Sequence, residues 1–345
     1  MDINQLLRKN IAALSPYSCA RDEFEGEASV YLDANENPYN APYNRYPDPL
    51  QKALKEKIAA LKGLRPEQIF LGNGSDESID LAFRAFCEPR LDNVLAIAPT
   101  YGMYKVCADI NDVAYREHLL DADFQFKAED LLARCDEHTK LIFLCSPNNP
   151  TGNSLCSSEI VKVIENFQGL VMLDEAYIDF SSQDSFCSLL DKYPNLVIFQ
   201  TFSKAWASAG LRLGMAFASP EIIAVYNKVK YPYNVNLQTQ QLMLAHLQEP
   251  QRIQAWVTEL IEQRSFLQQA LAALPIVQHI YPSDANFLLV KVDDADALYQ
   301  YLVAQGIIVR NRNRVRLCEG CLRITVGTAD ENAALMAAMQ QFINL

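Results

Sequence analysis

The sequence has no long hydrophobic run and no excess of basic residues. No uninterrupted apolar stretch in the 345 residues approaches the 18 or so that would span a bilayer, which excludes a membrane-spanning helix. With 30 Lys and Arg against 42 Asp and Glu, the formal net charge is −12, and such a chain repels the phosphate backbone of nucleic acids. The opening MDINQLLRKNIAALSPYS also lacks the apolar core and cleavage site of a signal peptide. We therefore expect a cytoplasmic protein that binds neither a membrane nor a nucleic acid.

The sequence also lacks the paired cysteines of a zinc site or of a disulfide framework. Its 9 cysteines are an odd number and are scattered along the chain, which is typical of reduced thiols. Only Cys318 and Cys321 form a CxxC pair, and neither a second pair nor a histidine lies near them. We expect no metal site.

Two common nucleotide-binding fingerprints are missing as well. Gly72 and Gly74 in LGNGSDES begin a GxG pattern, but Glu77 stands where a dinucleotide-binding fold needs its third glycine, and no GK[ST] follows for a P-loop. The segment still joins an apolar strand end to a helix through glycines. Backbone amides at such a helix N-terminus favour an anion, so the stretch predicts a phosphate site of another kind.

What the sequence does contain is an alternation of short apolar runs and helical patterns, which predicts an α/β fold. Runs that are apolar throughout indicate strands buried on both faces of a mostly parallel sheet. The runs are VLAIA (94–98), LIFLC (141–145), LVMLD (170–174), LVIFQ (196–200) and LGMAFAS (213–219). We expect helices over 49–61, 77–86 and 157–167 between them. After about residue 235 the pattern changes to a long helix over 250–274, a helix over 295–305, a final helix, and strands at 286–292, GIIVR (306–310) and LRITV (322–326), which indicates a smaller α+β domain.

A single lysine, Lys204, lies within TFSKAWASAGLRLG, which follows the apolar run at 196–199. A lysine at a strand end is often an ordinary surface residue whose ammonium reaches water. Apolar neighbours would instead lower its pKa, and a neutral amine forms a Schiff base, most often with pyridoxal phosphate. That cofactor also needs an acid at its pyridine nitrogen and donors for its phosphate, and Ser203 and Arg212 are available as donors.

Three further segments end strands with polar or aromatic side chains. Asp174 closes LVMLD, where a carboxylate meets a ligand at the carboxyl edge of the sheet, although it could equally cap a helix. Tyr177 follows three residues later. Asn149 lies in SPNNPTG, which is either a plain turn or a segment aimed at the cofactor, and Tyr101 in APTYGMY is placed to stack on a planar ring.

Taken together, these segments resemble the class II aminotransferases among the fold-type I pyridoxal-phosphate-dependent enzymes, and within them the branch that acts on histidinol phosphate. The matching motifs run in family order over nearly the whole chain: LDANENPY (32–39), RYPDP (45–49), LGNGSDE (71–77), APTYGMY (98–104), SPNNPTG (146–152), LDEAY (173–177), TFSKAWASAGLRLG (201–214) and CLRITVGT (321–328). The resemblance implies a large domain (29–240) with a mostly parallel seven-stranded sheet, a small C-terminal domain (241–345), and an N-terminal arm (1–28) that packs with the small domain and with a partner subunit.

The same resemblance assigns roles residue by residue. Lys204 is the Schiff-base lysine, Asp174 pairs with the pyridinium nitrogen, and Tyr177 and Asn149 reach the phenolic oxygen. Tyr101 stacks on the ring. The cofactor phosphate is held by Ser203, Arg212 and the backbone of Ser75 and Asp76, with Tyr46 entering from the partner of a homodimer.

The implied reaction is a ping-pong transamination of L-histidinol phosphate with 2-oxoglutarate, which gives imidazole-acetol phosphate and L-glutamate in histidine biosynthesis. Arg323 matches the family's substrate arginine, and we expect Arg310 and Tyr17 to help it bind anionic substrates. Which of Arg310, Arg312, Arg314 and Arg316 points inward stays open at this stage, as does the pocket shape, because Trp206 stands where many relatives have phenylalanine.

Two other functions fit the same sequence. Related enzymes transaminate aromatic amino acids or decarboxylate threonine phosphate, and they share the residues at Lys204, Asp174 and Arg212. A different class of protein, a non-catalytic binding protein on the same scaffold, would leave Lys204 as a surface charge.

Overall fold

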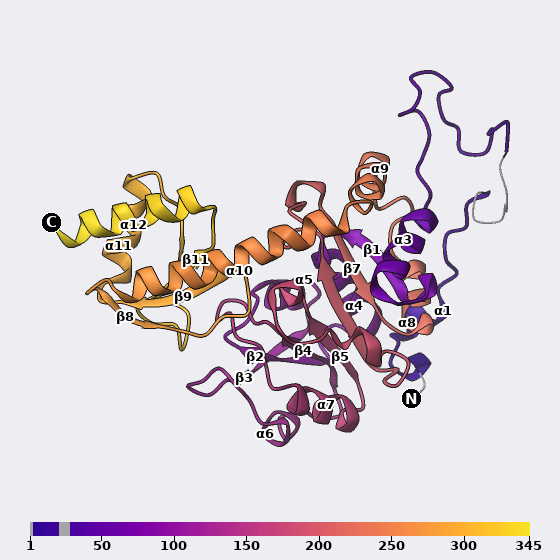
Figure 1. The fold of residues 1–345 in the computed structure, drawn as a ribbon. Helices are drawn as coiled ribbons and strands as arrows, with labels where there is room; N and C mark the ends of the chain where they lie inside the picture. The colour runs from indigo at the N-terminus through magenta and orange to yellow at the C-terminus, as the bar shows by residue number, and fades with distance from the viewer. Residues whose placement is uncertain (1–2, 21–27) are drawn as a thin grey trace.

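The computed structural model describes residues 3–20 and 28–345, and its strands form two separate sheets joined by a long helix (Figure 1). Within those residues no helix is both long enough and apolar enough to cross a membrane. The larger sheet has seven strands in the order β1-β7-β6-β5-β4-β2-β3. These are β1 Ile69–Asn73, β2 Asn93–Ala98, β3 Ala114–Leu119, β4 Thr139–Cys145, β5 Leu170–Asp174, β6 Leu196–Thr201 and β7 Leu213–Phe217.

The predicted mostly parallel sheet is confirmed. Strands β3, β2, β4, β5 and β6 pair in parallel, and β7 is antiparallel to both of its neighbours, β6 and β1. The carboxyl ends of the five parallel strands therefore meet at one edge of the sheet. In such sheets ligands bind outside that edge.

The apolar runs are continuous because the sheet is covered on both faces. Along β4, Phe143 faces a core with helices α4 (Ser75–Phe86), α5 (Met103–Ile110) and α8 (Pro220–Val229), while Ile142 faces the opposite core. The opposite core includes residues of α3 (Lys52–Lys62), α6 (Ala128–Leu132), α7 (Ser157–Asn166) and α10 (Pro250–Ala272). Successive side chains of a strand point to opposite faces, so each strand needs apolar residues at every position.

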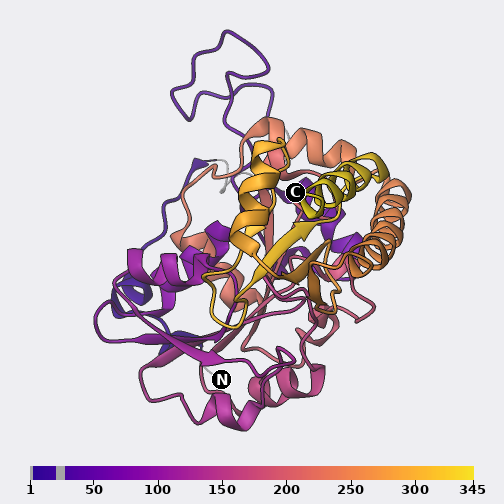
Figure 2. The ribbon, with the colours of Figure 1, turned by 90° about the vertical axis from the view of Figure 1, so that its left-hand side faces the viewer.

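The second sheet has four antiparallel strands in the order β10-β11-β9-β8, with β8 Val277–Ile280, β9 Phe287–Val292, β10 Arg310–Asn311 and β11 Cys321–Thr325. Helices α11 (Ala295–Ala304) and α12 (Ala329–Ile343) and the end of α10 supply its apolar core. Figure 2 shows these helices around the small sheet. The 23-residue helix α10 begins near the large sheet and ends in this second core.

The N-terminal arm differs from its prediction where it is described. We expected it to pack with the small domain, but Ile3 of η1 (Ile3–Gln5) and Ile11 of α1 (Lys9–Ala13) join the core of α4 and α8 instead. The Arg8 side chain also donates a hydrogen bond to the Arg84 carbonyl of α4. Residues 1–2 and 21–27 of the predicted arm lie outside the described residues. The predicted boundary at residue 240 falls inside α9 (Leu237–His246), which packs on α3.

One predicted strand was largely wrong. GIIVR was expected to be a strand over 306–310, yet Ile307 and Ile308 lie in irregular chain and only Arg310 enters β10. Ile308 is 73% exposed, so the apolar residues Ile307 and Ile308 do not belong to a strand that is buried on both faces. The polar edge strand β3 and strand β8 were not predicted, because neither has a continuous apolar run.

Candidate active site

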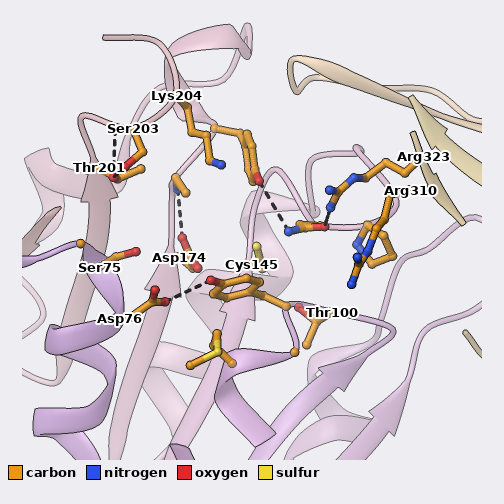
Figure 3. Close-up of a pocket in the computed structure, with 18 of the residues that line it drawn as sticks. Ser75, Asp76, Thr100, Cys145, Asp174, Thr201, Ser203, Lys204, Arg310 and Arg323 are labelled. Atoms are coloured by element: carbon orange, nitrogen blue, oxygen red, sulfur yellow. Dashed lines mark hydrogen bonds between the residues drawn. The ribbon is translucent and has the colours of Figure 1, made fainter. Parts of the chain in front are cut away.

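A cavity of about 800 Å³ opens at the carboxyl edge of the large sheet and reaches the second sheet (Figure 3). Most of the residues predicted for the site line it together: Ser75, Asp76, Tyr101, Asn149, Asp174, Tyr177, Ser203, Lys204, Arg212, Arg310 and Arg323. They follow strands β2, β4, β5 and β6, begin α4, or lie within strands β5, β10 and β11. The fold therefore brings residues that are up to about 250 positions apart into one cavity.

Asp174 is the last residue of β5 and is only 3% exposed. Its Oδ2 accepts a hydrogen bond of 2.6 Å from the Tyr104 hydroxyl, and its Oδ1 accepts one of 3.0 Å from the backbone amide of Ala176. Burial raises the pKa of Asp174, and the two hydrogen bonds lower it; burial has the larger effect, and the pKa is about 6. The carboxylate is thus held in a fixed orientation and gains from a cationic partner.

Lys204 lies in the turn after β6 with its amine directed into the cavity (Figure 3). Its Nζ sits 5.6 Å from the centre of the Tyr177 ring. Burial lowers the pKa of Lys204, and the positive charges of Arg323 and Arg212 lower it further, while Asp174 and Asp76 act in the opposite direction. A neutral amine at this position is a nucleophile and a proton acceptor.

An anion cradle lies at the side of the cavity where α4 begins. The backbone amide of Gly74, which precedes α4, donates to the Arg212 carbonyl at 2.8 Å, so Arg212 is held against the helix N-terminus. A Cβ on Gly74 would lie 2.9 Å from an Arg212 guanidinium nitrogen. The hydroxyl groups of Thr201 and Ser203 are hydrogen-bonded to each other at 3.0 Å beside it. Amides, a guanidinium and hydroxyls at a helix N-terminus form a site for a phosphate group.

The opposite side of the cavity carries a polar chain that links the two sheets. Arg323 of β11 donates a hydrogen bond of 2.5 Å to Asn149 Oδ1, and Asn149 Nδ2 donates one of 3.5 Å to the Tyr177 hydroxyl. Asn149 therefore orients both a guanidinium and a phenol toward the cavity. Burial raises the pKa of Tyr177, which keeps its hydroxyl protonated as a donor.

The structure separates the four arginines of RNRNRVR. Arg310 and Arg312 line the cavity with Arg323, whereas Arg314 and Arg316 are exposed and do not. Arg310 lies directly across from Arg323 in the pairing of β10 with β11. Three guanidinium groups therefore gather at the end of the cavity nearest the second sheet.

Two predicted residues lie away from this cavity. Tyr46 stacks on Tyr233 with ring centres 4.5 Å apart and lines a different pocket, and Tyr17 is 71% exposed. Tyr101 does line the cavity, where its hydroxyl donates to Asp76 at 3.1 Å. Tyr46 was expected to act in the partner's site, so its position in one chain is compatible with that expectation.

Sequence reasoning missed Tyr104 and left Arg312 undecided among four arginines. Tyr104, in α5, is fully buried and contacts Asp174, and Arg312 lines the cavity beside Arg310. A signal for Tyr104 was present, since a tyrosine on the apolar face of a helix needs a partner for its hydroxyl. Among the residues that the structure describes, no group of three or more His, Cys, Asp or Glu side chains is arranged to hold a metal ion.

Comparison with known proteins places this geometry in a family. The family model of aminotransferase class I and II matches residues 29–339. The chain is 61% identical to the histidinol-phosphate aminotransferase of Bacteroides fragilis (strain YCH46) over 341 residues, which cover 99% of each chain.

Solved structures show the same fold. The histidinol-phosphate aminotransferase of Sinorhizobium meliloti, in complex with pyridoxal-5'-phosphate, aligns with a TM-score of 0.81 at 23% identity over 90% of both chains. The L-threonine-O-3-phosphate decarboxylase of Porphyromonas gingivalis aligns with a TM-score of 0.74 at 21% identity, covering 88% of this chain and 92% of that one. On the sequence matches, this chain belongs to the class I and II aminotransferases and, within them, to the histidinol-phosphate aminotransferases.

Proposed function

We propose that the protein catalyses the pyridoxal-phosphate-dependent transamination of L-histidinol phosphate with 2-oxoglutarate, giving imidazole-acetol phosphate and L-glutamate, as a step of L-histidine biosynthesis. The observation that carries the proposal is the convergence of Lys204, Asp174 and the α4 cradle in one cavity with an arginine cluster at its other end. The 61% identity to a histidinol-phosphate aminotransferase over 99% of the chain supports the choice of substrate.

The cavity fits the cofactor in size and in chemistry. The cradle at Ser75, Ser203 and Arg212 suits a phosphate, and Gly74 leaves the space that a side chain would fill. Asp174 suits a protonated ring nitrogen, because a buried carboxylate with a raised pKa gains from a neighbouring cation. Asn149 and Tyr177 offer donors for an oxygen on the ring, and Tyr101 offers an aromatic face.

Bound pyridoxal phosphate supplies an electron sink that stabilises negative charge on the substrate carbon. The residues of this chain then do the remaining work. Lys204 would hold the cofactor through its Nζ, and the same Nζ, when free, would take the proton from the substrate carbon that carries the amine. Burial lowers the pKa of Lys204, which favours the uncharged amine that can accept the proton.

Arg323 and Arg310 bind the negative group of each substrate in turn. A guanidinium forms bidentate, charge-assisted hydrogen bonds with a phosphate and with a carboxylate, so one pair of arginines serves both half-reactions. This explains how a protein with a net charge of −12 binds anionic substrates. Tyr17 is proposed as a helper, and it would act after rearrangement or from a partner, since it is 71% exposed in one chain.

The protein is further proposed to be a cytoplasmic homodimer with shared active sites. The segment before α3 projects from the body of the chain (Figure 2) and carries large exposed hydrophobic residues, including Leu32 at 91%, Tyr39 at 79% and Tyr43 at 61% exposure. An exposed apolar group of this kind marks an interaction surface. A second copy is the occupant that places Tyr46 against the neighbouring cofactor phosphate.

Domain boundaries remain part of the proposal. We divide the chain into an arm (1–28), a large domain (29–240) and a small domain (241–345), with the cavity between the two sheets. Helix α9, which contains the proposed boundary at residue 240, packs on α3 of the large domain.

A spectroscopic experiment separates this function from its rivals. L-Histidinol phosphate is added to the cofactor-loaded protein without a keto acid, and an aromatic amino acid is added to a second sample at the same concentration. We expect the visible absorption band of the lysine-bound cofactor to disappear with L-histidinol phosphate and to return on addition of 2-oxoglutarate. If the band disappears only with the aromatic amino acid, L-histidinol phosphate is not the substrate. If the protein shows no such band at all, it does not act as a pyridoxal-phosphate enzyme.

A further inference from the structure

The cluster at the end of the cavity holds one arginine more than the proposed mechanism uses. Arg312 lines the cavity together with Arg310 and Arg323, on the side away from the α4 cradle. Figure 3 shows Arg310 and Arg323 at that end and Ser75 and Asp76 at the other. Arg314 and Arg316 of the same basic run do not line the cavity.

The backbone fixes Arg312 in this position. Its amide donates a hydrogen bond of 2.9 Å to the Cys321 carbonyl, and its carbonyl accepts one of 2.8 Å from the amide of Val315. Arg310 precedes it by two residues along an extended segment, so both side chains leave the backbone on the same face. Since Arg310 pairs directly with Arg323 across the strands, the three guanidinium groups become neighbours.

The Arg312 side chain is half-buried and lacks an acidic partner. Its Nε is buried without a hydrogen-bond partner, and so is the Nε of Arg323. Within residues 3–20 and 28–345, no ion pair to a carboxylate is formed by Arg310, Arg312 or Arg323. Burial lowers the pKa of Arg312, and the charges of Arg323 and Arg310 lower it further. Burying a charged donor without a partner costs free energy, and a bound anion would offset that cost.

We propose that Arg312 is a third substrate-binding arginine and that it sets the preference of the site for a phosphate group over a smaller or uncharged one. The inference rests on the proposed function and deepens it. A phosphate dianion has three terminal oxygens and two charges, whereas a carboxylate has two oxygens and one charge. Two guanidinium forks satisfy a carboxylate, and a third adds charge-assisted hydrogen bonds that only the phosphate fully uses.

The test compares the cofactor-loaded Arg312→Gln and Arg314→Gln variants, which remove the same charge from inside and outside the cavity. The KM values for L-histidinol phosphate and for L-histidinol, which lacks the phosphate, are measured for both. We expect Arg312→Gln to raise the KM for L-histidinol phosphate by about tenfold or more, with a smaller change in kcat and no change for L-histidinol. Arg314→Gln should match the wild type with both substrates.

A binding measurement gives a readout that does not depend on turnover. The dissociation constant of imidazole-acetol phosphate for the cofactor-loaded enzyme is measured by calorimetry. It should rise by a similar factor of about ten in Arg312→Gln and stay unchanged in Arg314→Gln. Arg312→Lys keeps the charge but lacks the planar guanidinium, so its dissociation constant should lie between those of Arg312→Gln and Arg314→Gln. If Arg312→Gln does not retain the cofactor, the comparison of Arg312→Lys with Arg314→Gln tests the inference.

Two outcomes would overturn the inference. One is an Arg312→Gln enzyme whose KM for L-histidinol phosphate equals that of Arg314→Gln. The other is an equal rise in KM for L-histidinol, which would show a structural role for Arg312. Failure of the proposed function is recognised separately, because the wild-type enzyme itself would then not convert L-histidinol phosphate, and the inference would fall with it.

Discussion

The hydroxyl of Tyr104 donates a hydrogen bond of 2.6 Å to Asp174 Oδ2, and both side chains are buried. This bond favours the ionised form of Asp174, which burial alone disfavours. Tyr104 does not line the cavity, so its effect on the proposed reaction would pass through Asp174, as that of a positioning residue.

Replacing this tyrosine should weaken the enzyme most at low pH. The pKa of Asp174, about 6 in the cofactor-free protein, is lowered by the Tyr104 hydrogen bond, so in Tyr104→Phe it rises and the carboxylate is protonated over more of the acidic range. We expect kcat to fall by about tenfold, in line with the loss of a hydrogen bond to a charged group, and to fall further at pH 6 than at pH 8. Steady-state rates across that range, with the visible spectrum of the bound cofactor, measure the effect.

Tyr226→Phe is the matched control. Tyr226 is also fully buried, but its hydroxyl has no hydrogen-bond partner among the described residues. Removing it should leave activity unchanged and should not lower the free energy of unfolding. A pH profile of Tyr104→Phe that parallels the wild type would contradict the role of this contact.

The buried carboxylate of Asp174 should lower the stability of the cofactor-free protein. The pKa of Asp174 is about 6 in the folded state against 3.8 ordinarily, so its ionisation disfavours folding by up to roughly 3 kcal/mol above pH 6. Between pH 6 and pH 4 the folded protein binds the proton more readily than the unfolded chain, and this cost shrinks as the pH falls. Asp174→Asn should therefore raise the melting temperature of the cofactor-free protein more at pH 7.5 than at pH 4.5.

The same substitution should abolish most of the activity, because a neutral amide does not pair with a ring cation. Thermal melts at both pH values test the expected change in stability, and an assay of the cofactor-loaded variant tests the expected loss of activity. A cofactor-free Asp174→Asn protein that melts below the wild type at pH 7.5 would show that the carboxylate is stabilising.

Gly214 should tolerate no side chain. A Cβ at this position would lie 2.1 Å from the amide nitrogen of Ser75 and 2.2 Å from the carbonyl carbon of Gly74, so the backbone itself would have to shift. Gly214→Ala should push β7 away from the start of α4, destabilise the fold by about 1–3 kcal/mol or more, and weaken cofactor binding at the cradle.

Gly210→Ala provides the comparison within the same segment. A Cβ there meets no atom within 4 Å, so we expect stability and cofactor affinity close to the wild type. Denaturant titration and cofactor titration measure both quantities. Equal effects of the two substitutions would show that the contact between Gly214 and the α4 N-terminus is unimportant.

Shared active sites should be detectable by mixing two inactive proteins. Lys204→Ala removes the proposed catalytic amine from one subunit, and Tyr46→Ala removes the residue proposed to enter the partner's site. Hybrid dimers contain one site with both changes and one with neither. Random mixing should therefore restore about a quarter of the wild-type activity, since half of the dimers are hybrids with one intact site each.

Each variant assayed alone supplies the baseline for this experiment. Lys204→Ala should show no turnover, and Tyr46→Ala should show little. Tyr39→Ala, which alters another exposed tyrosine of the projecting segment, should keep its activity. A mixture no more active than the sum of its parts would mean that each site is complete within one chain.

The large sheet was predictable from the sequence because its strands are buried on both faces. Runs such as 141–145 and 170–173 are apolar at every position, and each proved to lie within a strand at the centre of the sheet. The edge strand β3 reads AYREHL, with several partly exposed positions, and so it carried no such pattern. Prediction therefore succeeded at the centre and failed at the edge.

The candidate site divides in the same way. Lys204, Asp174 and Asn149 follow strands of the parallel sheet, so their meeting at one edge follows from the topology alone. Arg312 could not be distinguished from Arg314 or Arg316 by sequence, because their order around the cavity depends on the short pairing of β10 with β11 and on the turn closed by Val315. Tyr104 required knowledge of which helix face covers Asp174.

Arg310 and Arg323 lie in the small sheet, whereas Lys204 follows a strand of the large sheet. This division affects how the enzyme can evolve. On the proposed roles, substitutions among residues 310–323 would change the anionic group that is recognised, while Lys204 and Asp174 would keep the cofactor chemistry on the other sheet. New substrate preferences can therefore arise by mutation of one short hairpin without loss of a working catalyst. For protein engineering, the same hairpin is the segment to exchange between relatives when a different substrate is wanted.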